Sequence, residues 1–237
     1  MAQKKLKRFA AIKAFHHVFE YPENMAGQWH AFFQNDQPIV LELACGKGEY
    51  TTGLAAMHPE KNYIGVDVKG NRMYVGAKKA LDQRLRNVAF LRCQIDMISA
   101  YFSPGEVSEI WLTFPDPQLR TGKNKKRLTH PKFLRKYETI LQPEGVLHLK
   151  TDSPLLYNFT LGVLKHYNGK VLKQYDDVYA QATEPQLLDI KTHYETLDIA
   201  QSGKIHYLKF HLPRNLDAKL NEEFTQWVKE VEIGREP

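Results

Sequence analysis

The chain has 237 residues, of which 43% are hydrophobic and 25% charged, and its formal net charge is +6. These fractions are typical of globular proteins, and the length suits one large α/β domain. No apolar run reaches the roughly 18 residues that a membrane-spanning helix needs. Two cysteines, Cys45 and Cys93, are too few for a disulfide framework or a structural zinc site. We expect a cytoplasmic protein with no membrane partner and no metal.

The excess positive charge is concentrated in two clusters. Lys4–Arg8 contains four basic residues, and Arg120–Arg127 contains five. Such clusters attract nucleic-acid phosphates, because each neutralised phosphate releases counterions. The alternative is a solvated surface without a partner. We interpret residues 1–37 as a basic N-terminal arm or helix, followed by a domain over residues 38–237.

From residue 38 onward, short apolar runs alternate with longer amphipathic stretches. The runs are rich in leucine and β-branched residues and predict buried strands, whereas the longer stretches have helical periodicity and end at proline or glycine. In chain order, the sequence predicts strand 39–43, helix 50–57, strand 63–67, helix 71–83, strand 88–92, strand 109–113, helix 131–141 and strand 146–150.

After residue 150 the rhythm changes. The sequence predicts helix 155–167, strand 171–175, a long loop to 203, strand 204–211 and a final helix 221–231. Alternating strands and helices form right-handed βαβ units. We therefore predict an α/β fold with a doubly wound, Rossmann-like sheet, mostly parallel with an antiparallel final strand.

The first predicted strand leads into a glycine loop. Gly46 and Gly48 let the backbone pass close under a ligand at the carboxyl ends of the strands. A plain tight turn is the alternative. Glu42 is a carboxylate within an otherwise apolar strand, which is costly unless a partner satisfies it. Asp67 ends the second strand, where an acid can bind ribose hydroxyls.

Three observations bear on the cofactor. The third glycine of a nicotinamide fingerprint is replaced by Thr51, and no P-loop spacing occurs. An acid just before the glycine loop repels a pyrophosphate but suits the cationic end of S-adenosyl-L-methionine. Asp96 follows the third strand, where it can accept from an adenine amino group or, alternatively, cap a helix. The residues that together favour S-adenosyl-L-methionine over NAD are Glu42, Gly46, Gly48, Asp67 and Asp96.

Asp116 lies between Pro115 and Pro117 in the loop after the fourth strand. The prolines restrict the backbone and fix the direction of the carboxylate; a turn aspartate that caps a helix is the alternative. The N-P-P-[YF] tetrad of enzymes that methylate exocyclic amines is absent. An acid with no neighbouring general base suits an acceptor that already has a free lone pair.

Four stretches occur in a characteristic order: T-F-P-D-P at Thr113–Pro117, K-R-L-T-H-P-K-F-L at Lys126–Leu134, L-K-T-D at Leu149–Asp152 and T-H-Y-E at Thr192–Glu195. In these motifs the chain resembles the bacterial tRNA (guanine-N7-)-methyltransferase family, over residues 38 to 211. The second and third stretches are far more diagnostic than the glycine loop.

The resemblance implies a Rossmann-like methyltransferase domain that transfers a methyl group from S-adenosyl-L-methionine to N7 of a guanine in the tRNA variable loop. The implied cofactor ligands are Glu42, Asp67, Asp96 and Asp116. The implied substrate contacts are Arg120, Asp152, Thr192, His193, Tyr194 and Glu195. Because guanine N7 loses no proton on methylation, Asp116 is the candidate catalytic residue, a fixed carboxylate that stabilises positive charge on the base. Both basic clusters would grip tRNA phosphates, and we expect a monomer or a homodimer.

One stretch departs from the family pattern. The family has D-P-W-P-K-x-R-H where this chain has D-P-Q-L-R-T-G from Asp116 onward. Arg120 stands in place of a substrate-contacting lysine, and arginine makes a fork rather than a point contact. Another RNA or acceptor is therefore an alternative, as is a non-catalytic RNA-binding module. For Asp152 and Glu195, the alternative is capping and loop salt bridges.

Overall fold

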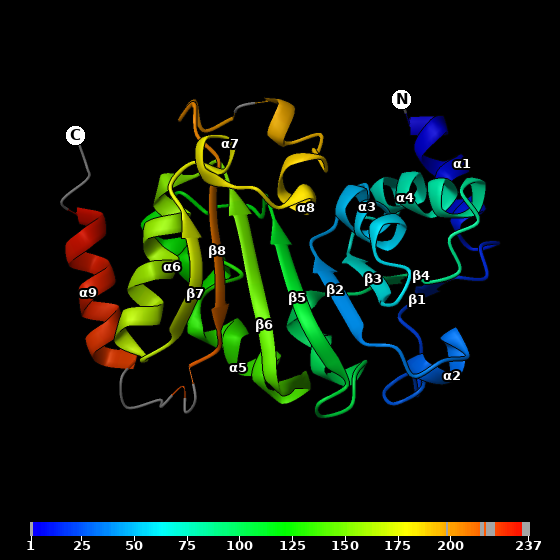
Figure 1. Ribbon diagram of the computed structural model, residues 1–237, viewed down its shortest axis with the longest axis horizontal. Coiled ribbons are helices and arrows are strands. Elements are labelled where there is room, and N and C mark those ends of the chain that lie inside the picture. The colour runs from blue at the N-terminus through cyan, green and yellow to red at the C-terminus, as the bar shows by residue number, and fades with distance from the viewer. Residues whose placement is uncertain (1, 198, 214–215, 217–220, 234–237) are drawn as a thin grey trace.

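The computed structural model describes residues 2–197, 199–213, 216 and 221–233. They form one eight-stranded sheet in the order β1-β4-β3-β2-β5-β6-β8-β7 (Figure 1). Neighbouring strands are parallel, except that β8 runs antiparallel to both β6 and β7. The predicted doubly wound, mostly parallel sheet with an antiparallel final strand is confirmed.

The elements have the following bounds. The strands are β1 (Val18–Glu20), β2 (Ile39–Leu43), β3 (Asn62–Asp67), β4 (Val88–Arg92), β5 (Val107–Thr113), β6 (Leu141–Thr151), β7 (Lys170–Tyr175) and β8 (His206–His211). The α-helices are α1 (Ala2–Ile12), α2 (Trp29–Phe33), α3 (Glu49–Met57), α4 (Gly70–Asp82), α5 (Pro131–Ile140), α6 (Pro154–His166), α7 (Val178–Gln181), α8 (Pro185–Leu188) and α9 (Asn221–Ile233). Short 3₁₀ turns are η1 (Ile95–Ala100), η2 (Thr121–Lys126) and η3 (Glu195–Leu197).

Helices cover both faces of the sheet, because side chains alternate along each strand. Leu41 and Leu43 of β2 belong to a core that includes buried residues of α2, α5, α6 and α9. Val40, which directly precedes Leu41, belongs to the opposite core, with buried residues of α1, α3, α4, α7 and α8. Every residue of β2, including the single carboxylate, is buried. This double burial explains why its sequence, apart from Glu42, is apolar throughout instead of alternating.

The N-terminal segment is part of this architecture. Its strand β1 pairs with β4 at the edge of the sheet, and α1 packs beside α4. Ile12 is buried, and the Arg8 guanidinium lies 5.5 Å from the ring centroid of Tyr74. The sequence predicts the helix but neither β1 nor α2. The side chains of Lys4 and Lys5 lie outside the described part of the structure.

The carboxyl ends of β2, β5 and β6 lie at one edge, uppermost in Figure 1, where α7 and α8 sit above them. The long loop predicted after β7 therefore carries short helices of its own. No helix within the described residues is long and apolar enough to cross a membrane.

The last helix is docked through a close approach between α6 and α9. A Cβ atom added at Gly162 of α6 would overlap the indole ring of Trp227 on α9. We expect Gly162→Ala to lower the free energy of unfolding by about 1–3 kcal/mol, the usual cost of overpacking. Urea unfolding measures it, and Gly122→Ala, where a Cβ meets no atom within 4 Å, is the matched control. Equal stability of the two variants would contradict this packing.

Candidate active site

Two adjoining cavities open at the carboxyl edge of the sheet. The larger, of about 540 Å³, is lined by loops that follow β2, β3, β5 and β6. The smaller, of about 370 Å³, is lined by residues after β3 and β4 and by Phe133 of α5. Both include Ala44, Asp67 and Val68 in their walls. Of the predicted site residues, the larger cavity gathers Gly46, Asp67, Asp116, Asp152 and Tyr194, and the smaller gathers Asp67 and Asp96.

Asp67 organises the glycine loop. Its carboxylate accepts hydrogen bonds from the amides of Gly46 (2.9 Å) and Lys69 (2.8 Å). Gly46 has a φ of +57° and lies beneath the ring of Tyr194, whose Cε2 would be 3.7 Å from a Cβ atom at Gly46. Tyr194 also lies 5.5 Å from the guanidinium of Arg72. Tyr194 and Arg72 therefore form a roof over the glycine loop.

Gly48 lies outside the walls of both cavities. A Cβ atom there would approach the Phe90 ring to 2.7 Å, and its φ is +68°. The glycine thus allows the first turn of α3 to pack closely on β4. Gly48 therefore supports the glycine loop by packing and does not line the cavity.

Glu42 also lies beneath the cavities and lines neither. Its carboxyl oxygens accept hydrogen bonds from the Thr51 amide (2.7 Å), the Thr51 hydroxyl (2.5 Å) and the Thr113 hydroxyl (2.7 Å). Burial raises the pKa of Glu42 to about 7, although these hydrogen bonds act in the opposite direction. The protein itself thus supplies the partners that this buried group requires.

Asp116 is exposed at the mouth of the larger cavity, and its Oδ1 accepts from the amide of Gln118 (2.9 Å). Arg127 supports this loop: its guanidinium donates to the carbonyls of Pro117 and Gln118, each at 3.0 Å. It also lies 4.5 Å from the ring centroid of Phe159 and is fully buried. The prediction that Arg127 binds phosphate is therefore wrong, because its charge is committed to the Asp116 loop.

Asp96 is the second residue of η1, whose N-cap is Gln94, so the capping alternative does not apply. Its carboxylate forms ion pairs with Lys132 (2.6 Å) and Lys136 (3.8 Å). Sequence reasoning missed the apolar walls beside it. Leu128 and Phe133 both belong to the diagnostic K-R-L-T-H-P-K-F-L stretch, and this was the signal that could have found them.

The T-H-Y-E stretch is held by reciprocal capping. The Glu195 amide donates to the Thr192 hydroxyl (3.1 Å), and the Glu195 carboxylate accepts from the Thr192 amide (3.3 Å). That carboxylate is also 3.0 Å from the ammonium of Lys150, and only 5% of the Glu195 side chain is exposed. Thr192 is buried, whereas His193 is exposed and its amide donates to Glu49 (3.3 Å). Capping and a salt bridge, the alternative for Glu195, are thus present.

The two remaining predicted substrate contacts differ in position. Asp152 lines the larger cavity, and its Oδ2 accepts from the amide of Ala200 (3.2 Å). Arg120 is exposed at the start of η2 and does not line the cavity. It adjoins the exposed Lys123, Lys125 and Lys126.

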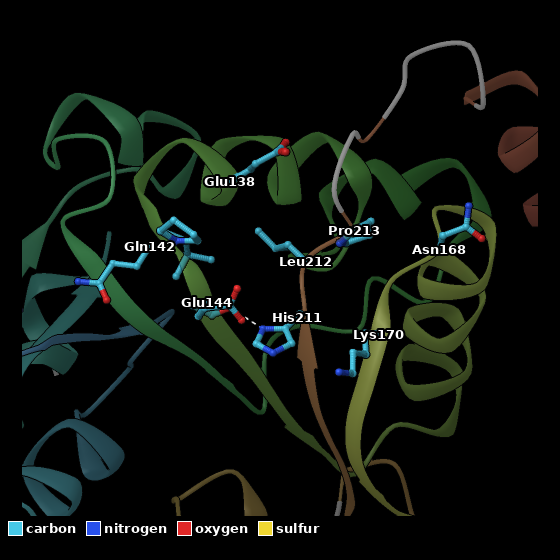
Figure 2. A pocket seen from close by; sticks show the side chains of 11 residues that line it. Glu138, Gln142, Glu144, Asn168, Lys170, His211, Leu212 and Pro213 are labelled. Atoms are coloured by element: carbon cyan, nitrogen blue, oxygen red, sulfur yellow. Dashed lines mark hydrogen bonds between the residues drawn. The ribbon is translucent and has the colours of Figure 1, made fainter.

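A further cavity, of about 580 Å³, opens at the opposite edge, where β6 and β7 begin (Figure 2). Glu138, Lys170 and His211 are among its lining residues, and His211 Nδ1 is 3.2 Å from the carbonyl oxygen of Gly145. It contains none of the predicted site residues. No group of histidine, cysteine or acidic residues in the described ranges is arranged to hold a metal ion. The carboxyl-edge cavities are therefore the candidate site.

Comparisons with known proteins identify the family of this chain. Residues 36–208 match a family model described as a putative methyltransferase. A tRNA (guanine-N(7)-)-methyltransferase of Bacteroides thetaiotaomicron is 45% identical over 90% of this chain and 88% of its own length. The corresponding protein of Porphyromonas gingivalis is 46% identical, over 85% and 86%. The chain belongs to the bacterial tRNA (guanine-N7-)-methyltransferase family.

Solved structures give the same fold at low identity. The 16S rRNA methyltransferase KamB has a TM-score of 0.60 at 13% identity, covering 84% of this chain and 99% of its own. A 16S rRNA (adenine(1408)-N(1))-methyltransferase from Catenulisporales acidiphilia has a TM-score of 0.56 at 16% identity, with coverages of 79% and 93%. The likeness to these proteins concerns the fold alone.

The raised pKa of Glu42 predicts a pH dependence of stability. The pKa of Glu42 is 4.5 in the unfolded chain and about 7 in the folded protein. Between these two pH values the folded protein therefore binds more protons than the unfolded chain, and the stability that the protonated carboxyl contributes is lost as pH rises. Relative to Glu42→Gln, the wild-type free energy of unfolding should fall by up to about 3 kcal/mol across this window. Urea unfolding at both ends measures it. Exposed Glu23 provides the control Glu23→Gln, and a constant difference between wild type and Glu42→Gln would refute the assignment.

Proposed function

We propose that this chain transfers a methyl group from S-adenosyl-L-methionine to N7 of a guanine in the tRNA variable loop. The observation that carries the proposal is the convergence of Asp67, Asp116 and Asp152, from three strand ends, on one cavity in a member of this family. A tRNA substrate supports a cytoplasmic location for this activity.

The cavities suit the two ends of the cofactor. In the smaller one, Ile95, Leu128 and Phe133 provide apolar walls for a flat ring, and Asp96 is an acceptor for its amino group. Asp67, common to both cavities, is positioned for the ribose hydroxyls. Beneath the glycine loop, burial raises the pKa of Glu42 to about 7. A cation bound above Glu42 favours its ionised form.

The residues present match the chemistry of N7 methylation. S-adenosyl-L-methionine supplies a methyl group on a cationic sulfur, and N7 offers an in-plane lone pair and releases no proton. Alignment of the two can lower the barrier by about 7–11 kcal/mol without a general base. Asp116, held by Gln118 and the Arg127-bound loop, is the fixed carboxylate that stabilises positive charge developing on the guanine.

Substrate contacts come from the rim of the larger cavity. Asp152 accepts from the Watson–Crick edge of the guanine, and His193 and Tyr194 border the base. Thr192 and Glu195 contribute by holding the segment that carries these two residues. Arg120 replaces the lysine of the family, and its guanidinium binds a tRNA phosphate through two parallel hydrogen bonds.

We expect Asp116→Asn to abolish most of the activity. With labelled S-adenosyl-L-methionine and unmodified tRNA, nucleoside mass spectrometry should detect 7-methylguanosine, formed about 100-fold more slowly by Asp116→Asn, as when one electrostatic group is removed from a transition state. Asp36→Asn changes an exposed aspartate far from the cavity and is the control. Label in another nucleoside, or only in another RNA, would overturn the proposed substrate, and wild-type turnover by Asp116→Asn would overturn the role of Asp116.

The exposed lysines of η2 should set the salt dependence of tRNA binding. Each lost phosphate contact reduces the slope of log K against log salt by about 0.7–0.9. Replacement of Lys123, Lys125 and Lys126 by glutamine should therefore flatten the slope by about 2 units, measured by filter binding. The control replaces exposed Lys165, Lys170 and Lys229, which lie on or beside α6 and α9. Equal slopes for the two triple variants would exclude η2 from the interface.

A further inference from the structure

Lys150 is a buried cation beside the candidate site that the mechanism above does not use. It lies near the end of β6 and pairs in register with Thr113 of β5 and Tyr207 of β8. Its side chain is 0% exposed, and the rings of Tyr50, Phe114 and Tyr179 lie 5.5–5.9 Å from its ammonium. Burial lowers the pKa of Lys150, and the neighbouring carboxylate of Glu195 acts in the opposite direction. A charge in such a place needs specific partners.

The partners of Lys150 come from three segments around the cavity. The ammonium donates to the carbonyl of Leu187 at the end of α8 (2.7 Å) and forms the 3.0 Å ion pair with Glu195. The backbone carbonyl of Lys150 accepts from the amide of Phe114 (2.8 Å), the first residue of the Asp116 loop. Phe114 has a φ of +47°, uncommon for a bulky side chain. One residue thus fixes α8, the Asp116 loop and the T-H-Y-E stretch.

Glu195 is adjacent to the residue that covers the cofactor cavity. We define residues 192–197 as the roof segment. Within it, Tyr194 lies over Gly46 and beside Arg72, while Thr192 and Glu195 cap each other. The ion pair with Lys150 joins this segment to a buried residue of the central sheet, and the Tyr179 hydroxyl also donates to the Glu195 carboxylate.

We propose that Lys150 is a positioning residue which, through Glu195 and Leu187, holds Tyr194 over the cavity and so sets the affinity for S-adenosyl-L-methionine. This inference rests on the proposed function and deepens it. It also accounts for Glu195, whose carboxylate faces Lys150 and not the cavity. A role in stability alone would give a different result, because replacing both partners of a buried ion pair by apolar residues is often neutral for stability.

The test compares Lys150→Met with the double variant Lys150→Met/Glu195→Leu. The control is Lys173→Met, which removes a lysine of β7 that pairs with Glu184 of the same long loop but is 46% exposed. Four quantities are measured: the free energy of unfolding in urea, the dissociation constant of S-adenosyl-L-methionine by calorimetry, hydrogen exchange of the roof-segment amides without ligand, and kcat with KM for S-adenosyl-L-methionine.

Lys150→Met should be less stable, exchange its roof-segment amides faster and bind S-adenosyl-L-methionine about tenfold more weakly, as when a binding-competent conformation is populated only one-tenth of the time. KM should rise by a similar factor while kcat at saturation stays within about threefold. The double variant should regain stability but keep the fast exchange and the weak binding. Lys173→Met should match wild type in binding and in roof-segment exchange.

The inference is overturned if the double variant regains wild-type affinity and exchange together with its stability, or if Lys150→Met binds like wild type. Failure of the proposed function looks different. In that case wild-type protein binds S-adenosyl-L-methionine in calorimetry but forms no 7-methylguanosine in tRNA, and the binding and exchange measurements still decide the role of Lys150.

Discussion

The common direction of β2, β3, β5 and β6 is the constraint on which the site depends. Gly46, Asp67, Asp116 and Asp152 are far apart in the sequence, yet each lies at or just after the end of one of these strands. Parallel pairing brings all four to the same edge. If any one strand ran the other way, its loop would lie at the far edge and the cavity would lose a wall.

Two buried ionisable groups, Glu42 and Lys150, connect the elements around the cavities. Glu42 of β2 accepts hydrogen bonds from Thr51 of α3 and Thr113 of β5, and Lys150 of β6 is bonded to Leu187 of α8 and to Glu195. Burying either group in an apolar environment without its hydrogen-bond partners would cost free energy. In the arrangement that gives both groups their partners, Asp116 and Tyr194 line the larger cavity. Arg127 holds the Asp116 loop by hydrogen bonds to the carbonyls of Pro117 and Gln118, and its guanidinium packs on the ring of Phe159 of α6.

Sequence patterns predict the elements that have a strong local signal. Strands β2 and β4 have the predicted bounds, and the helices agree to within a few residues. Strand β6 begins at Leu141 and not at 146, because a register shift against β5 accommodates the stretch with Pro143 and Gly145. Strand β1 has three residues, too few to show a period. Strand propensity therefore does not predict a strand of this length.

Site residues are predictable by position along the strands, whereas their partners are not. The placing of Asp67, Asp96, Asp116 and Asp152 at strand ends follows from local order alone. Whether a charge is buried depends on contacts distant in sequence, as for Glu195 with Lys150. The same holds for Arg127, which sits in a basic run but points inward. The sequence of a basic cluster does not show which of its side chains is buried.

The most direct test of this account is a crystal structure of the protein with S-adenosyl-L-homocysteine. We predict the adenine in the smaller cavity beside Asp96 and Phe133, the ribose hydroxyls on Asp67, and the sulfur below Tyr194 on the side of Asp116. Binding of the ligand at the amino-edge cavity of Figure 2, or at the carboxyl edge with neither Asp67 nor Asp96 in contact, would contradict the account.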